Sequence, residues 1–148
     1  MKKLEQFLKD HRACKDGLEF ARDLTLEESL NTCERGDWIL WLFQRMNPSS
    51  LKELTLAKAH CANTIRHLMK DERSLNAVDV AMKFGRGEAS RKELDTAAFA
   101  ASDASADAFA AAAASAAAFA AAEENQKLTA DICREYLPLS IWNQNFNN

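Results

Sequence analysis

An alanine tract limits what this chain can fold into more than any other feature of the sequence. Between Ala97 and Ala122, 18 of 26 residues are alanine. Alanine is the best helix former because its side chain loses no entropy in a helix. Disordered spacers are instead rich in proline, glycine, serine and charge. The tract therefore predicts helix, and its small side chains allow a neighbouring helix to approach closely.

The length of the tract gives a second expectation. As one straight helix, residues 90–125 would measure roughly 54 Å, whereas a compact domain of this size has a radius of gyration of roughly 15 Å. Phe99, Phe109 and Phe119 also cannot share one face of a straight helix, because each ten-residue step drifts by about 80°. We therefore predict a break near residues 102–107 and an alanine-rich helical hairpin in the core. A single long helix is the alternative.

The rest of the chain also indicates helix. Its 148 residues are enough for one domain. There is no glycine after Gly87 and no proline between Ser49 and Leu137, so turn formers are scarce. Three capping boxes, each a Ser or Thr followed three residues later by Glu, mark helix starts. They are Thr25 with Glu28, Ser50 with Glu53, and Ser90 with Glu93.

These signals predict an all-α fold. We expect a single domain over residues 1–148, with about seven or eight antiparallel helices in a bundle or in HEAT-like repeat packing. The helix after Ser50 should run to about residue 70. The polar end of the chain, residues 139–148, should be a frayed tail.

The most apolar stretch follows an Arg-Gly-Asp triplet, in "CERGDWILWLF" at 33–43. Because it is apolar all round, this helix should be central to the fold. Asp37 is expected to cap its start, and Asn47-Pro48 to end it. Arg35, Asp37, Trp38 and Trp41 are candidate binding residues that could line a pocket. The alternative is structural: a cap, a local ion pair and core tryptophans.

No motif in the chain indicates catalysis or a cofactor. There is no glycine-rich phosphate loop, nucleophile elbow or HExxH, so we expect neither an enzyme nor a cofactor. His11 lies three residues from Cys14, and His60 and His67 flank Cys61, but these spacings match no zinc motif. We therefore expect no metal site.

Charge is distributed unevenly along the chain. The net charge is −3, and residues 95–131 hold six acidic residues against the single basic residue Lys127. Such acidity disfavours nucleic acid, which requires phosphate neutralisation, and it suits a basic protein partner. Asp103 and Asp107, four residues apart, are candidate binding residues on this face. A merely solvated helix face is the alternative.

We expect a cytoplasmic protein that does not enter membranes. The N-terminal "MKKLEQFLKDHR" loses its apolar character at once and does not continue as an export signal. The alanine tract carries Asp103 and Asp107, so it does not read as a membrane span. The four cysteines form no CxxC pair and are expected to be reduced thiols.

Several segments together resemble the immunity-five-like domain, an immunity protein family of bacterial polymorphic-toxin systems. The resemblance covers about 13–138 and is carried by "ACKDGLEFA" at 13–21, "CERGDWILWLF" at 33–43, 73–98, the alanine tract and "ADICREYLP" at 130–138. Phe20 departs from the pattern, in which we would expect Trp. Arg35, Asp37, Trp38 and Trp41 match the family motif.

The resemblance implies an all-α packing of antiparallel helices and a non-enzymatic protein that neutralises a toxin by direct binding. It supplies no catalytic residues. A phage or mobile-element inhibitor of a host defence system is an alternative with the same fold. A small-ligand-binding domain with its pocket near Arg35–Trp41 is another, and a scaffold that forms homo-oligomers through small-residue faces is a third.

Overall fold

The described part of the chain is all-α, as predicted. The computed structural model describes residues 3–112 and 117–144, and the side chains of 102–122 lie outside that description. Its α-helices are α1 (Lys3–Asp10), α2 (Lys15–Ala21), α3 (Leu26–Thr32), α4 (Gly36–Met46), α5 (Leu51–Asn63), α6 (Glu72–Gly85), α7 (Arg91–Ala112) and α8 (Ala117–Tyr136). Short 3-10 turns, Arg66–Leu68 and Leu139–Ile141, follow α5 and α8. This count agrees with the seven or eight helices expected, and the described residues contain no strand.

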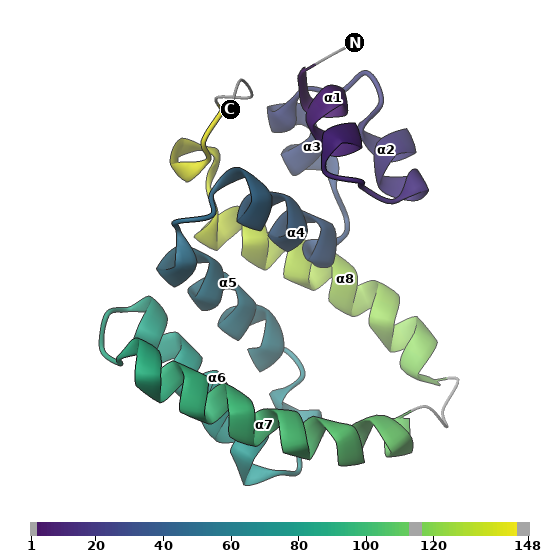
Figure 1. The fold of residues 1–148 in the computed structure, drawn as a ribbon. Coiled ribbons are helices and arrows are strands. Elements are labelled where there is room, and N and C mark those ends of the chain that lie inside the picture. The colour runs from purple at the N-terminus through teal and green to yellow at the C-terminus, as the bar shows by residue number, and fades with distance from the viewer. Residues whose placement is uncertain (1–2, 113–116, 145–148) are drawn as a thin grey trace.

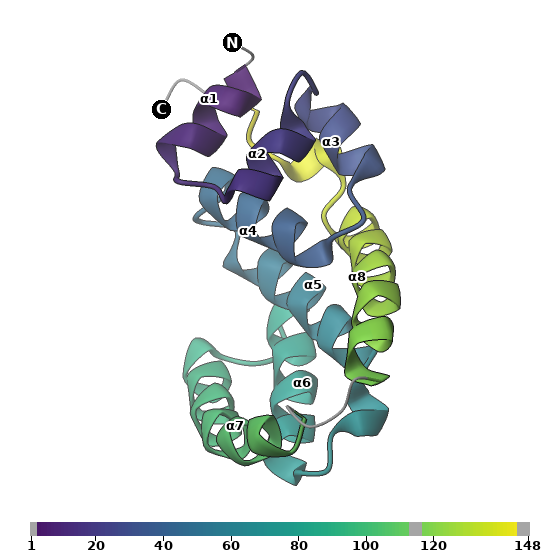
Figure 2. The same cartoon turned by 90° about the vertical axis from the view of Figure 1, so that its right-hand side faces the viewer.

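Helices α4, α5 and α8 form the middle of the molecule. Helix α8 packs against both α4 and α5, while α6 packs on α5 and α7 packs on α6. The three short helices α1, α2 and α3 lie over α4 at the opposite end from α6 and α7 (Figures 1 and 2). The C-terminal turn after α8 lies at the same end as α1.

One hydrophobic core joins the short helices to the middle layer. It draws on α1 to α5, on α8 and on the C-terminal turn, and α4 contributes the most to it, as its apolar sequence predicted. The core comprises Leu4, Leu8, Ala21, Leu26, Leu30, Cys33, Ile39, Leu42, Phe43, Met46, Leu54, Ala57, Ala130, Cys133, Leu137 and Trp142. Fully buried Ala57 and Ala130 show that small residues outside the tract let the helices pack closely.

The alanine tract is divided between two helices, but the predicted position of the break is wrong. Helix α7 continues through residues 102–107 and ends at Ala112, and α8 begins at Ala117. The serines and aspartates of 102–107 do not interrupt it, because their small helix penalties are outweighed by the surrounding alanines. The predicted hairpin packing depends on side chains of residues 102–122, which lie outside the description. The rings of Phe109 and Phe119 are among them.

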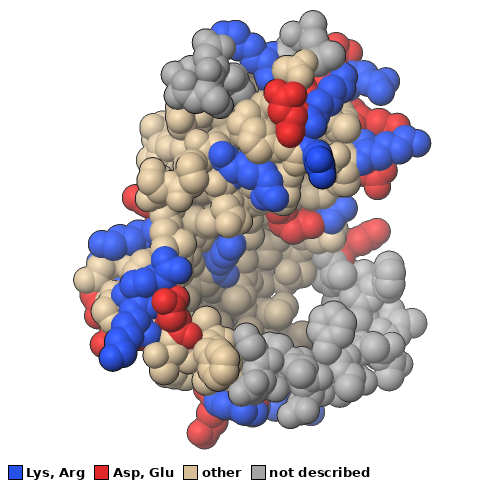
Figure 3. Space-filling view, viewed as in Figure 1, with Lys and Arg blue, Asp and Glu red and all other residues tan. Residues whose placement is uncertain are grey.

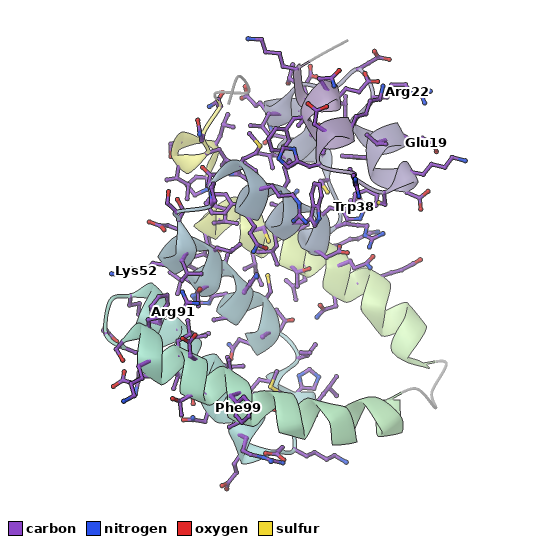
Figure 4. All side chains as sticks on the ribbon, in the orientation of Figure 1. Glu19, Arg22, Trp38, Lys52, Arg91 and Phe99 are labelled. Atoms are coloured by element: carbon purple, nitrogen blue, oxygen red, sulfur yellow. The ribbon has the colours of Figure 1, made fainter. Side chains whose placement is uncertain are left out.

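Phe99, one of the three phenylalanines of the tract, is not buried. Its side chain is 75% exposed where it projects from α7 (Figure 4). Ala97, on the same helix, is buried instead. Helix α7 packs on α6, and a small side chain such as that of Ala97 allows packed helices to approach closely.

Two of the three predicted capping boxes are confirmed. Thr25 and Glu28 exchange both hydrogen bonds at the start of α3. Ser90 and Glu93 do the same before α7, at 2.9 and 3.1 Å. The third box is wrong, because the Ser50 side chain makes no capping bond although α5 does begin after it.

The predicted end of the helix after Ser50 and the predicted fraying from residue 139 are also wrong. Helix α5 ends at Asn63 and not near residue 70, so Ile65 and Leu68 lie beyond the helix, where they are exposed. The residues 139–144 are not frayed, because Trp142 is 4% exposed and its indole N–H donates to the Leu137 carbonyl at 2.8 Å. The rest of the predicted tail, 145–148, lies outside the described residues.

Candidate functional site

A pocket lies between the short helices and α4, around the motif that the sequence singled out. We call it the α1–α4 pocket, and its volume is about 490 Å³. It is lined by Leu4, Leu8, Arg12, Ala13, Cys14, Gly17, Phe20, Ala21, Ser29, Leu30, Cys33, Asp37, Trp38, Ile39, Trp41 and Leu42. Most of these side chains are apolar, so the pocket favours an apolar occupant.

Two indoles of α4 form one wall of this pocket. Trp38 and Trp41 are three residues apart, which places them on the same face of the helix. Both are half-buried and not fully inside the core. Phe20 of α2 packs beside Trp38, with their ring centroids 5.9 Å apart. Figure 4 shows Trp38 on the side of α4 that faces α2.

Arg35 and Asp37 form the local ion pair that the structural interpretation predicted. Arg35 donates from Nε and Nη2 to the two carboxylate oxygens of Asp37, at 3.1 and 2.6 Å. This hydrogen bond raises the pKa of Arg35 above its ordinary value. Both side chains are well exposed, so the pair contributes little to stability.

The predicted cap at Asp37 is wrong. Helix α4 begins at Gly36, so Arg35 is the N-cap residue, and its side chain makes no capping bond. Asp37 lies instead in the first turn, where its negative charge is favourable beside the positive end of the helix dipole. The predicted end of this helix is confirmed, because Asn47 follows the last helical residue.

Each pocket indole carries a guanidinium on its ring. The Cζ atom of Arg35 lies 4.4 Å from the Trp38 ring centroid, and that of Arg45 lies 4.0 Å from the Trp41 centroid. Both distances are within the range of a cation–π contact, which is an attraction that restrains the ring. The four candidate residues of the motif are therefore brought together at one site.

Cys33, the buried one of the two cysteines that line the pocket, is not a reactive nucleophile. Burial raises the pKa of the Cys33 thiol above its ordinary value, and the thiol donates to the Arg35 carbonyl at 3.4 Å. A protonated, buried thiol is chemically inert. Cys61 and Cys133, whose sulfurs lie 3.9 Å apart, belong to the α5–α8 contact and do not line the pocket.

Two of the three histidines that the sequence places near cysteines, His11 and His60, stack on aromatic rings. His60 stacks on Tyr136, with ring centroids 4.0 Å apart, and burial lowers its pKa. His11 stacks on Phe7 at 3.9 Å. Within residues 3–112 and 117–144, no three His, Cys, Asp or Glu side chains gather where they could hold a metal ion.

Two carboxylates of the predicted acidic face are paired with arginines in the described residues. Asp95 pairs with Arg91 on α7 at 2.9 Å, and Asp131 pairs with Arg134 on α8 at 2.5 Å. Figure 3 shows acidic and basic side chains interspersed on the face it presents. Asp103 lies in the same helix as Asp107, but both side chains are outside the described residues.

Sequence reasoning missed the pocket residues outside the motif, and Ser29 is one of them. Ser29 lies on α3, and its hydroxyl is the one buried side-chain oxygen or nitrogen of the described residues that has no hydrogen-bond partner. In sequence it is an ordinary serine inside a short helix, so no pattern distinguishes it. The pocket itself was predicted only in position, near Arg35–Trp41, because its other walls come from α1, α2 and α3.

Among the described helices, none has both the length and the apolar character needed to cross a bilayer.

The motif segment that carries the resemblance to the immunity-five-like family lies in α4, beside this pocket. Family models, curated proteins and solved structures give no match to this chain, so membership of that family stays a prediction.

Proposed function

We propose that this protein is a non-enzymatic binding domain that holds a small apolar molecule in the α1–α4 pocket. One observation carries the proposal: a pocket of about 490 Å³ surrounds the motif residues. Ligand sites typically measure about 300–1,000 Å³ and have apolar walls with a few polar groups. Here the apolar walls come from four helices, and the polar groups are few.

The indoles support this proposal further. Aromatic rings contribute large apolar contact areas, and their orientation is fixed here by the guanidinium of Arg35 on Trp38 and that of Arg45 on Trp41. A wall that is already ordered loses little entropy when a ligand binds. Arg35 and Asp37 act at this site by positioning Trp38 and need no contact with the ligand.

Filling the pocket should abolish binding. Ala13 lines the pocket between α1 and α2 and is half-buried. In Ala13→Phe the added ring occupies ligand space, so we expect affinity to fall at least tenfold for any compound that binds the native protein. Thermal shift with a panel of phenols, indoles and fatty alcohols finds such compounds, and calorimetry then measures the affinities.

A matched variant separates pocket filling from a general effect of the larger side chain. Ala89 is also half-buried but lies between α6 and α7, away from the pocket. Ala89→Phe should leave affinity unchanged. If Ala13→Phe binds as tightly as the native protein, the α1–α4 pocket is not the binding site.

Protein binding of the immunity type is the second candidate. It is supported by the resemblance over residues 13–138 and by the Arg–Trp pairs at the pocket, since Trp and Arg are the residues most enriched in interface hot spots. On this reading the partner is a basic toxin or effector. A phage or mobile-element inhibitor would use the same kind of contact on a host defence protein.

A pull-down from native lysate tests this second candidate. A single basic protein, captured at low salt and released at high salt, is the expected result. The double variant Asp103→Lys, Asp107→Lys should then capture less of it while keeping its helical content. Unchanged capture would exclude the acidic face, and detection of self-association alone would indicate a homo-oligomeric scaffold instead.

A further inference from the structure

The α1–α4 pocket carries more positive than negative charge. Three guanidiniums belong to it: that of Arg12, which lines the pocket, and those of Arg35 and Arg45, which stack on the pocket indoles. Among the described residues that line the pocket, the one carboxylate is that of Asp37, and Arg35 already pairs with it at 2.6 Å. An anionic group that reaches this pocket therefore meets a net positive charge.

Arg12 is the guanidinium that is left for a ligand. Arg35 is held by Asp37 and by the Trp38 ring, whereas Arg12 forms no ion pair with any described residue. Arg12 is exposed, so a ligand oxygen can approach it from solvent. A guanidinium presents a planar fork of N–H groups that matches the two oxygens of a carboxylate.

The backbone at Arg12 gives a second reason to assign its side chain a role in binding. Its φ of 57° lies in the left-handed region. The Ala13 N–H donates to the Leu8 carbonyl at 2.9 Å, and the Arg12 N–H donates to the Lys9 carbonyl at 3.1 Å. This pattern is a Schellman motif, in which glycine is the usual residue at the left-handed position. Arginine weakens the turn there, so its side chain must serve something other than the turn.

The rest of the pocket suits the apolar part of such a ligand. Its walls are mainly apolar and include the rings of Phe20, Trp38 and Trp41. An apolar cavity of about 150 Å³ holds a benzene molecule, so about 490 Å³ admits a chain of about eight to ten carbons. A carboxylate in this interior would lose its hydration. It therefore stays at the exposed Arg12, and the carbon chain fills the pocket.

We propose that the α1–α4 pocket takes a medium-chain monocarboxylate, whose apolar chain lies among the pocket walls and whose carboxylate pairs with Arg12. Octanoate belongs to this class. The inference deepens the proposed function and rests on it. It adds the chemical class of the ligand and assigns Arg12 the role of binding its charged end.

The test compares octanoate with octan-1-ol, two probes of equal chain length with different end groups. At neutral pH the carboxylic acid is ionised. Calorimetry should show that Arg12→Gln lowers the affinity for octanoate about three- to tenfold, the value of an exposed hydrogen-bonded charge pair. The affinity for octan-1-ol should stay the same, because the variant removes a charge and keeps a polar side chain. Added salt should weaken the binding of octanoate to the native protein and should not weaken that of octan-1-ol.

Two further variants serve as controls. Arg22→Gln removes the same charge from an exposed residue that follows α2 and does not line the pocket, so the affinities for both probes should stay unchanged. Arg12→Gly separates binding from folding, because glycine adopts the left-handed conformation readily. Its melting temperature should stay constant or rise by about 2–4 °C, while its affinity for octanoate falls as in Arg12→Gln.

The outcomes separate this inference from the proposed function. An unchanged affinity of Arg12→Gln for octanoate, or an equal loss in Arg22→Gln, would overturn the role of Arg12. Binding of octan-1-ol that is lost in Ala13→Phe would still support the proposed function in that case. If octanoate does not bind the native protein, the ligand class is wrong, and the compound panel decides the proposed function independently.

Discussion

Replacing Trp142 with alanine should lower the free energy of unfolding by about 3–5 kcal/mol, the usual cost of removing a large buried aromatic side chain. Trp142 is 4% exposed although it lies close to the C-terminus. Its ring meets the fully buried Phe43 of α4 edge-on, with centroids 5.0 Å apart and an interplanar angle of 83°. Edge-to-face pairs of this kind add stability beyond their buried area.

Two hydrogen bonds hold the segment around Trp142. The indole N–H donates to the Leu137 carbonyl at 2.8 Å, and the backbone N–H of Asn143 donates to the side-chain oxygen of Asn47 at 2.7 Å. Asn47 ends α4, so the C-terminal segment covers the end of the central helix. Truncating the indole leaves a cavity beside Phe43 and frees this segment.

Urea unfolding followed by circular dichroism measures the effect without depending on tryptophan fluorescence. Ile141→Ala is the control, because Ile141 is adjacent but 38% exposed, and it should cost less than about 1 kcal/mol. A Trp142→Ala variant as stable as the native protein would show that the segment is not docked on α4.

The C-terminal segment shows one limit of sequence reasoning. Its composition is polar, and polar chain ends usually fray. Burial here depends on a single indole and on the shape of the surface next to Phe43, and neither is visible in a composition or a periodicity. Caps are predicted more reliably, because a capping box needs only residues three apart. Even so, Ser50 takes a backbone conformation that does not form one.

Helix α5 shows a second limit. Ile65 and Leu68 continue its apolar pattern beyond Asn63, so periodicity alone extends the helix to about residue 70. The Thr64 hydroxyl instead donates to the Cys61 carbonyl at 2.7 Å and accepts from Asn125 at 2.7 Å. Such side-chain bonds to the backbone compete with helix continuation. The partner from α8 is 61 residues away, so local sequence cannot reveal it.

Only one wall of the α1–α4 pocket, the one formed by the motif at the start of α4, could be predicted from the sequence. The motif residues lie within seven positions, from Arg35 to Trp41, so their proximity follows from the sequence. The walls from α1, α2 and α3 depend on how these short helices are placed. Arg134 of α8 contributes to that placement, because its guanidinium donates to the carbonyls of Leu30 and Cys33 at the end of α3, at 3.0 and 2.6 Å.

Replacing Gly36 with alanine should also destabilise the protein strongly, lowering the free energy of unfolding by about 3 kcal/mol. A Cβ atom at Gly36 would lie 2.4 Å from Oγ1 and 2.7 Å from the backbone carbonyl carbon of Thr129 on α8. The hydroxyl could rotate away, but the backbone of a packed helix cannot. Helix α4 must therefore move away from α8, which opens the core around the fully buried Ala130 and Cys133.

Gly17→Ala is the matched control, since Gly17 also lies in a helix beside the pocket. A Cβ atom there would meet only the Cys14 sulfur, at 3.4 Å, so this variant should be more stable by about 0.5–1 kcal/mol. The urea midpoints of the two variants should therefore shift in opposite directions.

The same comparison gives a structural reason for the glycine of the Arg-Gly-Asp triplet. It allows α4 to contact α8 at close range, while the neighbouring Arg35 and Trp38 remain at the pocket. If Gly36→Ala has the same urea midpoint as the native protein, the α4–α8 contact is loose enough to admit a methyl group. The glycine of the triplet would then have another role.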